Sequence, residues 1–123
     1  MLEINDLKKT FGNGSSALKG VNLKINKGEF VSILGPSGSG KTTLLRTING
    51  LETISGGEIY FDNKKVDSSS IREVQKKTSM IFQEFNLVNN LSVINNVLSG
   101  LLNSNSKFLS LFYLFPKNQR IKA

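Results

Sequence analysis

The chain has 123 residues, of which 38% are hydrophobic and 20% charged, so it is long enough for one small domain and its composition excludes general disorder. Cysteine and histidine are absent, which excludes disulfides, thiolate metal sites and imidazole chemistry. The net charge of +7 is compatible with a nucleic-acid partner, an anionic membrane surface or a solvated basic surface. We favour the solvated surface, because the basic residues are scattered and no nucleic-acid-binding motif is present.

Residues 1 to about 28 are expected to form short strands joined by turns. The apolar residues Val21, Leu23 and Ile25 alternate with polar ones, as in a half-exposed strand, and Asn26-Lys27-Gly28 predicts a turn. The chain starts without the basic and apolar regions of a signal peptide, so none is expected.

A phosphate-binding loop follows. Residues 30–34 form a short apolar run, typical of a buried parallel strand, and residues 35–42 read GPSGSGKT, a complete G-x-x-x-x-G-K-[ST] motif. The next residues predict a helix closed by Gly50, with an apolar face made of Leu44, Leu45, Ile48 and Leu51. Strand, loop and helix in this order favour a nucleoside triphosphate site over a flexible Gly/Ser turn.

The residue types of the loop suit a bound triphosphate. Glycines adopt backbone angles closed to other residues, so successive amides can surround a phosphate chain, and the positive end of the following helix adds to the field. Lys41 would contact the β and γ phosphates, and the Thr42 hydroxyl would coordinate the Mg²⁺ that bridges them. The candidate binding residues are Gly35, Pro36, Ser37, Gly38, Ser39, Gly40, Lys41, Thr42 and Thr43.

The middle of the chain predicts a strand at Ile59 and Phe61, which alternate with polar residues, followed by a turn at Asp62-Asn63. A short helix is predicted over residues 70–77, with Ser70 and Glu73 as a capping box. Residues 78–82 then predict a second buried strand.

A helix is predicted over residues 92–99, with Ser92 as N-cap and Gly100 as C-cap. Its apolar face consists of Val93, Ile94, Val97, Leu98 and Leu101. Residues 103–107 are polar, and the apolar cluster over 108–115 is too short to span a bilayer.

Four stretches follow one another in a particular order and spacing around the loop: Leu18–Phe30, Asn49–Leu51, Ser55–Ile59 and Met80–Gln83. Together with the loop they resemble the nucleotide-binding subunit of ATP-binding-cassette (ABC) transporters, from residue 1 to about 100. Later stretches also resemble the phosphonate-import ATPases of bacteria: Phe85–Leu87, Leu91–Val93, Asn96–Gly100 and Ser110–Lys117. Leu101 departs from that branch, in which a basic residue usually follows the Ser-Gly pair.

The resemblance implies an α/β fold, namely the N-terminal part of a P-loop NTPase with an antiparallel β subdomain and an incomplete core sheet. It assigns residues 1–102 to a partial ATP-binding domain. By composition, residues 103–123 are a polar linker, an apolar patch and a basic tail. The resemblance also implies ATP and Mg²⁺ as cofactors, and a second ATPase subunit and integral membrane permease subunits as partners. The implied location is peripheral, at the cytoplasmic face of the bacterial membrane.

Two residues outside the loop gain roles from the resemblance. Phe11 matches the aromatic residue that stacks on adenine in this family. The alternative interpretation of Phe11 is an ordinary aromatic residue of a turn or core. Gln83 matches the glutamine that ligates Mg²⁺ and holds the attacking water in this family. The alternative interpretation of Gln83 is an ordinary polar residue of the surface. Lys41 and Gln83 are therefore the candidate catalytic residues.

Other catalytic parts of the family have no counterpart here. Residues 85–123 contain no Asp or Glu, so the Walker B carboxylates are missing, and the switch histidine is missing too. Leu98-Ser99-Gly100 is followed by two leucines and lacks the rest of the signature loop.

Two hypotheses follow: the chain is the ATP-binding subunit of a bacterial importer of phosphonates or phosphate esters, or it is a non-catalytic, marginally stable remnant that binds nucleotide weakly or not at all. A GTPase or a nucleoside monophosphate kinase is disfavoured, because the guanine motif and an arginine-rich lid are absent.

Overall fold

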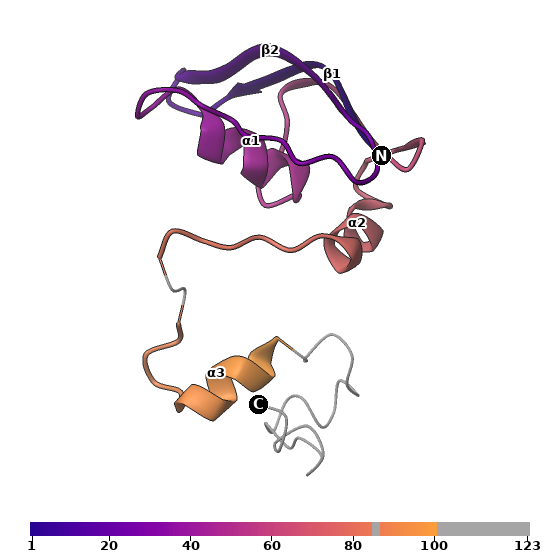
Figure 1. The fold of residues 1–123 in the computed structure, drawn as a ribbon. Helices are drawn as coiled ribbons and strands as arrows, with labels where there is room; N and C mark the ends of the chain where they lie inside the picture. The colour runs from indigo at the N-terminus through magenta and orange to yellow at the C-terminus, as the bar shows by residue number, and fades with distance from the viewer. Residues whose placement is uncertain (85–86, 101–123) are drawn as a thin grey trace. The chain divides into compact units, whose positions relative to one another are not determined.

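The computed structural model describes residues 1–84 and 87–100, which fall into two compact units. The first unit runs from Met1 to Ile81 and contains a sheet and two helices; the second begins at Phe82 and contains one described helix (Figure 1). None of the helices that the structure describes is long and apolar enough to cross a membrane. The predicted boundary at residue 102, the polar linker and the apolar patch over 108–115 lie outside the described residues.

The first unit is built on a four-stranded antiparallel sheet. Its strands are β1 (Leu2–Thr10), β2 (Ser16–Ile25), β3 (Gly56–Phe61) and β4 (Lys64–Lys65), in the order β2-β1-β3-β4. The alternation predictions fall on β2 and β3: Ile59 is buried in β3, and β2 alternates half-buried and exposed residues near its end. The predicted antiparallel β subdomain is therefore confirmed.

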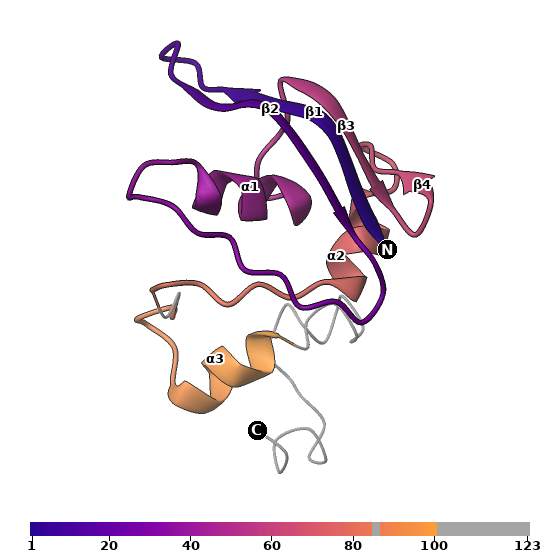
Figure 2. The ribbon, with the colours of Figure 1, turned by 45° about the horizontal axis from the view of Figure 1, so that its top comes forward.

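Helix α1 (Lys41–Ile48) packs on this sheet, as Figure 2 shows. Leu44 is buried in the core cluster, where it joins the sheet residues Ile4, Leu7, Leu18 and Ile59. The helix ends in a Schellman turn at Gly50, whose φ is 65°: the Gly50 amide donates to the Thr47 carbonyl at 3.1 Å, and the Leu51 amide donates to the Arg46 carbonyl at 2.8 Å. Gly50 thus closes the helix, as predicted.

The predicted apolar face of α1 is wrong at two of its four positions. Leu44 is buried and Ile48 packs against the core, whereas Leu45 and Leu51 are exposed. Leu45 lies a fraction of a turn away from Leu44 around the helix axis, and Leu51 follows the helix end, so neither faces the sheet.

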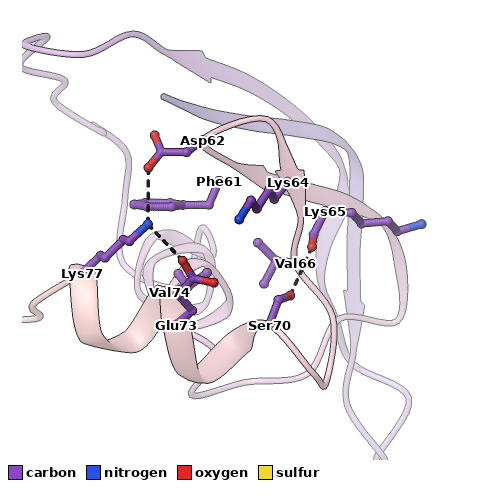
Figure 3. A pocket seen from close by; sticks show the side chains of 9 residues that line it. All are labelled: Phe61, Asp62, Lys64, Lys65, Val66, Ser70, Glu73, Val74 and Lys77. Atoms are coloured by element: carbon purple, nitrogen blue, oxygen red, sulfur yellow. Dashed lines mark hydrogen bonds and ion pairs between the residues drawn. The ribbon is translucent and has the colours of Figure 1, made fainter.

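Helix α2 (Ile71–Lys77) covers the β3–β4 hairpin. The hairpin turns at Asp62 and Asn63, whose φ angles of 50° and 63° suit a two-residue turn. Val74 is buried, and in Figure 3 it lines a small hollow together with residues of the hairpin. Lys77 closes this hollow from the helix, since its Nζ lies 3.9 Å from an Asp62 carboxylate oxygen and 3.2 Å from one of Glu73.

The predicted capping box of α2 is wrong. Ser70 has φ and ψ of −95° and −17°, which is helical rather than extended, so its hydroxyl does not cap the helix, and Glu73 pairs with Lys77 instead. Asp67 takes this role one turn earlier: its Oδ1 accepts the Ser69 and Ser70 amides at 2.9 and 3.0 Å. The Ser69 hydroxyl, together with these two amides and the Ser70 hydroxyl, lowers the pKa of the Asp67 carboxyl to about 2.

The two predicted buried strands, residues 30–34 and 78–82, are not strands in this structure. Phe30, Leu34 and Ile81 are 94%, 91% and 98% exposed. A strand of a parallel sheet is held by hydrogen bonds to neighbours on its sides, and within the described residues neither segment pairs with a neighbour. The antiparallel half of the expected fold is therefore formed and the parallel half is not.

The second unit contains α3 (Val93–Ser99). The Ser92 hydroxyl accepts the Asn95 amide at 3.3 Å, which confirms the predicted N-cap. Gly100 follows as C-cap with φ of −62°, so it takes its predicted place without a left-handed conformation. Of the predicted apolar face Leu98 is buried, Val93, Ile94 and Val97 are exposed, and Leu101 lies outside the described residues.

Candidate nucleotide-binding site

The phosphate loop joins an irregular segment to the first turn of α1. Gly40 is the N-cap of this helix and has φ of 92°, in the left-handed region. A Cβ atom added to Gly40 would lie 2.6 Å from the Ala17 carbonyl oxygen and 3.2 Å from Leu18 Cδ2, both in β2. Only glycine satisfies the conformation and the close approach together, so this residue seats the helix end of the loop against the sheet.

Lys41 is the first residue of α1, and its side chain folds back over the loop. The Nζ atom donates to the carbonyl oxygens of Gly35 at 2.7 Å and Pro36 at 2.6 Å, and it lies 3.3 Å from the Ser39 hydroxyl. The ammonium thus lies inside the turn that the sequence assigns to a phosphate chain.

The N-terminal end of α1 suits an anion. Its first turn contains no acidic residue, and no side chain caps its amides. The amides and the helix dipole therefore face the loop without a carboxylate to neutralise them. Thr42 is exposed and Thr43 half-buried on this turn, so the Thr42 hydroxyl is accessible to a ligand.

The structure brings Phe11 to the same end of the first unit. Phe11 lies in the loop between β1 and β2, where its amide donates to the Ser15 carbonyl and its carbonyl accepts the Gly14 amide, both at 2.9 Å. Figures 1 and 2 show this hairpin loop on the side of the sheet where α1 begins. A joint role of Phe11 and the phosphate loop toward one nucleotide stays a prediction.

Lys9 is a residue of this region that the sequence reasoning missed. It is only 6% exposed, and its Nζ lies 5.0 Å from the centre of the Phe11 ring. The same Nζ lies 3.3 Å from a Glu52 carboxylate oxygen and 3.3 Å from the Thr53 hydroxyl. The signal was present in the alternation of β1, because Lys9 stands two residues after the buried Leu7 and therefore on the same side of the strand.

Gln83 lies in the second unit, in an irregular segment, with its side chain exposed. Its role toward the phosphate loop, which belongs to the first unit, stays a prediction. Among the described residues, no group of three or more Asp, Glu, His or Cys is placed to hold a metal ion. A protein hydroxyl such as that of Thr42 nevertheless fits Mg²⁺, which keeps several waters and takes its other ligands from the phosphates.

A family model described as ABC transporter matches residues 18–123. The chain belongs to the ABC transporter family. The match covers the phosphate loop, α1, β3, β4 and most of β2, and the partial α/β fold with its antiparallel sheet agrees with it.

Curated relatives of the chain are named phosphonates import ATP-binding proteins PhnC. The protein from Thiobacillus denitrificans is 48% identical over 93% of this chain and 44% of its own length. Those from Lactobacillus acidophilus and Staphylococcus aureus are 45% and 43% identical over 100% and 99% of this chain, and each is covered over 49% of its length. The chain thus spans about half the length of the curated relatives it matches.

Solved ABC cassettes share the fold. The ATP-binding cassette MJ0796, in a dimeric post-hydrolysis state bound to ADP and Pi, superposes with a TM-score of 0.74 at 35% identity, over 99% of this chain and 53% of its own. The cassette cbiO1 from Clostridium perfringens, part of the complex cbiONQ, gives a TM-score of 0.70 at 32% identity, over 98% of this chain and 46% of its own.

Proposed function

We propose that this chain is the ATP-binding part of a bacterial ABC importer subunit that couples ATP hydrolysis to the uptake of phosphonates or phosphate esters. The observation that carries the proposal is the loop itself: an ammonium held inside a glycine-rich turn, at a helix N-terminus without acidic residues. The curated relatives support the solute class, since they are named phosphonates import proteins.

The loop residues would act together on the triphosphate. The amides over residues 35–43 would surround the phosphates, Lys41 would leave the loop carbonyls for the β and γ phosphate oxygens, and the Thr42 hydroxyl would hold Mg²⁺. The metal would neutralise the charge that develops on these oxygens during hydrolysis. Phe11 would stack on the adenine, a contact that places the base without reading its edge.

Gln83 would complete the site as a ligand of Mg²⁺ and a holder of the attacking water. The working protein would pair two ATPase subunits and dock them on integral membrane permease subunits, at the cytoplasmic face of the membrane. Membership of the ABC transporter family supports these partners, and the MJ0796 cassette is itself a dimer.

A second candidate is nucleotide binding without turnover. It is favoured by the sequence, because residues 85–123 contain no carboxylate that could activate water and no histidine is present. Loss of a water-positioning or charge-stabilising group in phosphoryl transfer costs about 10³–10⁵ in rate. We therefore expect the chain by itself to bind Mg·ATP and to hydrolyse it at a trace rate.

Equilibrium dialysis of Mg·ATP against the purified chain tests the proposal. Lys41→Ala removes the ammonium of the loop, and Lys19→Ala removes an exposed lysine of β2 as a matched control. We expect binding to be lost in the first variant and kept in the second. Equal affinity in all three proteins would refute the nucleotide site, and steady hydrolysis by the unmodified chain would refute the non-catalytic candidate.

A further inference from the structure

We propose that Lys9 is a positioning residue of the nucleotide site. Its buried ammonium fixes the Phe11 ring as a one-sided platform for the base and ties that platform to the helix that binds the phosphates. This inference rests on the proposed function, because it concerns the base that Phe11 would stack. It adds a residue to which neither the motif nor the family resemblance gave a role.

The burial of Lys9 has to be explained first. Its side chain is 8% exposed, and burying an ammonium is unfavourable unless it is paired and hydrogen-bonded. Glu52 and Thr53 supply that pairing, each with an oxygen 3.3 Å from Nζ. The neighbouring Lys8 shows that the strand offers an exposed alternative, since its side chain is 50% exposed and pairs with Asp6 at 2.6 Å.

The position of the ammonium then determines what the Phe11 ring can do. A cation 5.0 Å from the ring centre is attracted by the negative face of the ring. That face is occupied from within the protein, so a base can stack only on the opposite face. Since Phe11 lies in a hairpin loop, this contact also restricts the ring to fewer orientations before any ligand arrives.

Glu52 extends the connection to α1. Its second carboxylate oxygen lies 3.6 Å from Nε of Arg46, which belongs to the last turn of this helix. The Glu52 amide also donates to the Arg46 carbonyl at 3.2 Å. A continuous series of contacts therefore runs from Phe11 through Lys9 and Glu52 to Arg46. It connects the ring that would stack on the base to the helix whose first turn would face the phosphates.

This arrangement predicts an effect that depends on the base. If Lys9 positions Phe11, loss of its charge weakens binding of ATP and leaves binding of inorganic tripolyphosphate unchanged, because tripolyphosphate uses the loop and has no base. If Lys9 only supports the fold, both ligands lose affinity together. The ratio of the two dissociation constants separates these cases, whereas either constant alone does not.

The experiment measures binding of Mg·ATP and of Mg·tripolyphosphate to the full chain. Lys9→Met removes the charge and keeps the length of the side chain, Lys9→Arg keeps the charge, and Lys8→Met is the control on the exposed neighbour. We expect Lys9→Met to weaken ATP binding about fivefold, the size of a partly desolvated cation–π contact, with tripolyphosphate binding unchanged. Lys9→Arg should retain most of the ATP affinity, and Lys8→Met should change neither ligand.

Phe11→Ala separates the failure of this inference from that of the proposed function. We expect it to weaken ATP binding about tenfold, as for loss of one base–aromatic stack, and to make the further change Lys9→Met silent. If Phe11→Ala leaves the ratio of the two constants unchanged, the proposed base contact is refuted and Lys9 has no role through it. If Phe11→Ala changes the ratio and Lys9→Met does not, the positioning role alone is refuted.

A variant that keeps the internal charge balance protects the test against misfolding. Lys9→Met combined with Glu52→Gln leaves no unpaired carboxylate beside the methionine, and Arg46 is 41% exposed, so its charge remains solvated. The double variant is expected to reproduce the loss of ATP affinity at unchanged tripolyphosphate affinity. Equal affinity for ATP in the double variant and the unmodified chain would overturn the proposal.

Discussion

The close approach of Gly40 to β2 gives a stability prediction whose size can be worked from the structure. A β-carbon at residue 40 would lie 2.6 Å from the Ala17 carbonyl oxygen, a backbone atom that cannot move without shifting the strand. The residue also has φ of 92°, a left-handed conformation that costs an L-residue about 1–2 kcal/mol. With an overpacking cost of about 1–3 kcal/mol, Gly40→Ala should lower the free energy of unfolding by about 2–5 kcal/mol.

Two other glycines separate the two costs. Gly38 has φ of 78° and nothing within 4 Å of an added β-carbon, so Gly38→Ala carries the conformational cost alone. Gly12 also has nothing within 4 Å of an added β-carbon, and its φ is not left-handed, so Gly12→Ala carries neither cost. We therefore expect Gly12→Ala to be the most stable of the three variants, Gly38→Ala to be intermediate and Gly40→Ala to be the least stable.

Urea unfolding followed by far-ultraviolet circular dichroism measures this order as a shift of the midpoint, at an unchanged slope. Inorganic tripolyphosphate binding at zero urea then reports whether the loop itself is distorted. A midpoint for Gly40→Ala equal to that of Gly12→Ala would refute the reasoning, because the Ala17 contact would then have no energetic consequence.

Two further predictions concern the core and the response to acid. Leu7→Ala, at a residue with 0% exposure, should lower the free energy of unfolding by about 2–5 kcal/mol. Leu34→Ala, at a residue 91% exposed, should change it by less than about 0.5 kcal/mol. The urea midpoints of the two variants test this difference, and equal shifts would contradict the assigned core. The pKa of Asp67 is lowered from 3.8 to about 2 by its bonds to Ser69 and Ser70, so its contribution to stability is complete above pH 3.8 and is lost as the pH falls through about 2. Asp67→Asn should therefore flatten the decline of the thermal midpoint between pH 4 and 2, and an unchanged decline would show that the carboxylate does not stabilise the turn.

The antiparallel sheet was predictable because its signals are local. Alternation in β2 and β3, the turn at Asp62-Asn63 and the glycine that ends α1 each depend on residues close in sequence. The phosphate loop was predictable for the same reason, since its motif carries its own backbone requirements.

The two predicted parallel strands failed because their signal is incomplete. An apolar run such as residues 30–34 indicates burial, but burial requires neighbours that come from distant parts of a chain. Gln83 illustrates the same limit: its predicted role depends on a meeting between two units, and no local pattern specifies that meeting. Lys9 was missed for another reason, because its partner Glu52 follows α1 and the pairing is visible only once the strand and that segment are packed.

The contacts of Lys41 imply that a phosphate ligand would compete with the protein's own backbone for the same ammonium. The Nζ atom donates to the Gly35 and Pro36 carbonyl oxygens, so two peptide groups of the loop already hold the charge assigned to the phosphates. Under the proposed function, a phosphate chain would have to draw Lys41 away from these two oxygens, so part of the binding energy would go into breaking two existing hydrogen bonds. The internal contacts of Lys41 therefore set a cost that every phosphate ligand of this loop has to offset before it gains affinity.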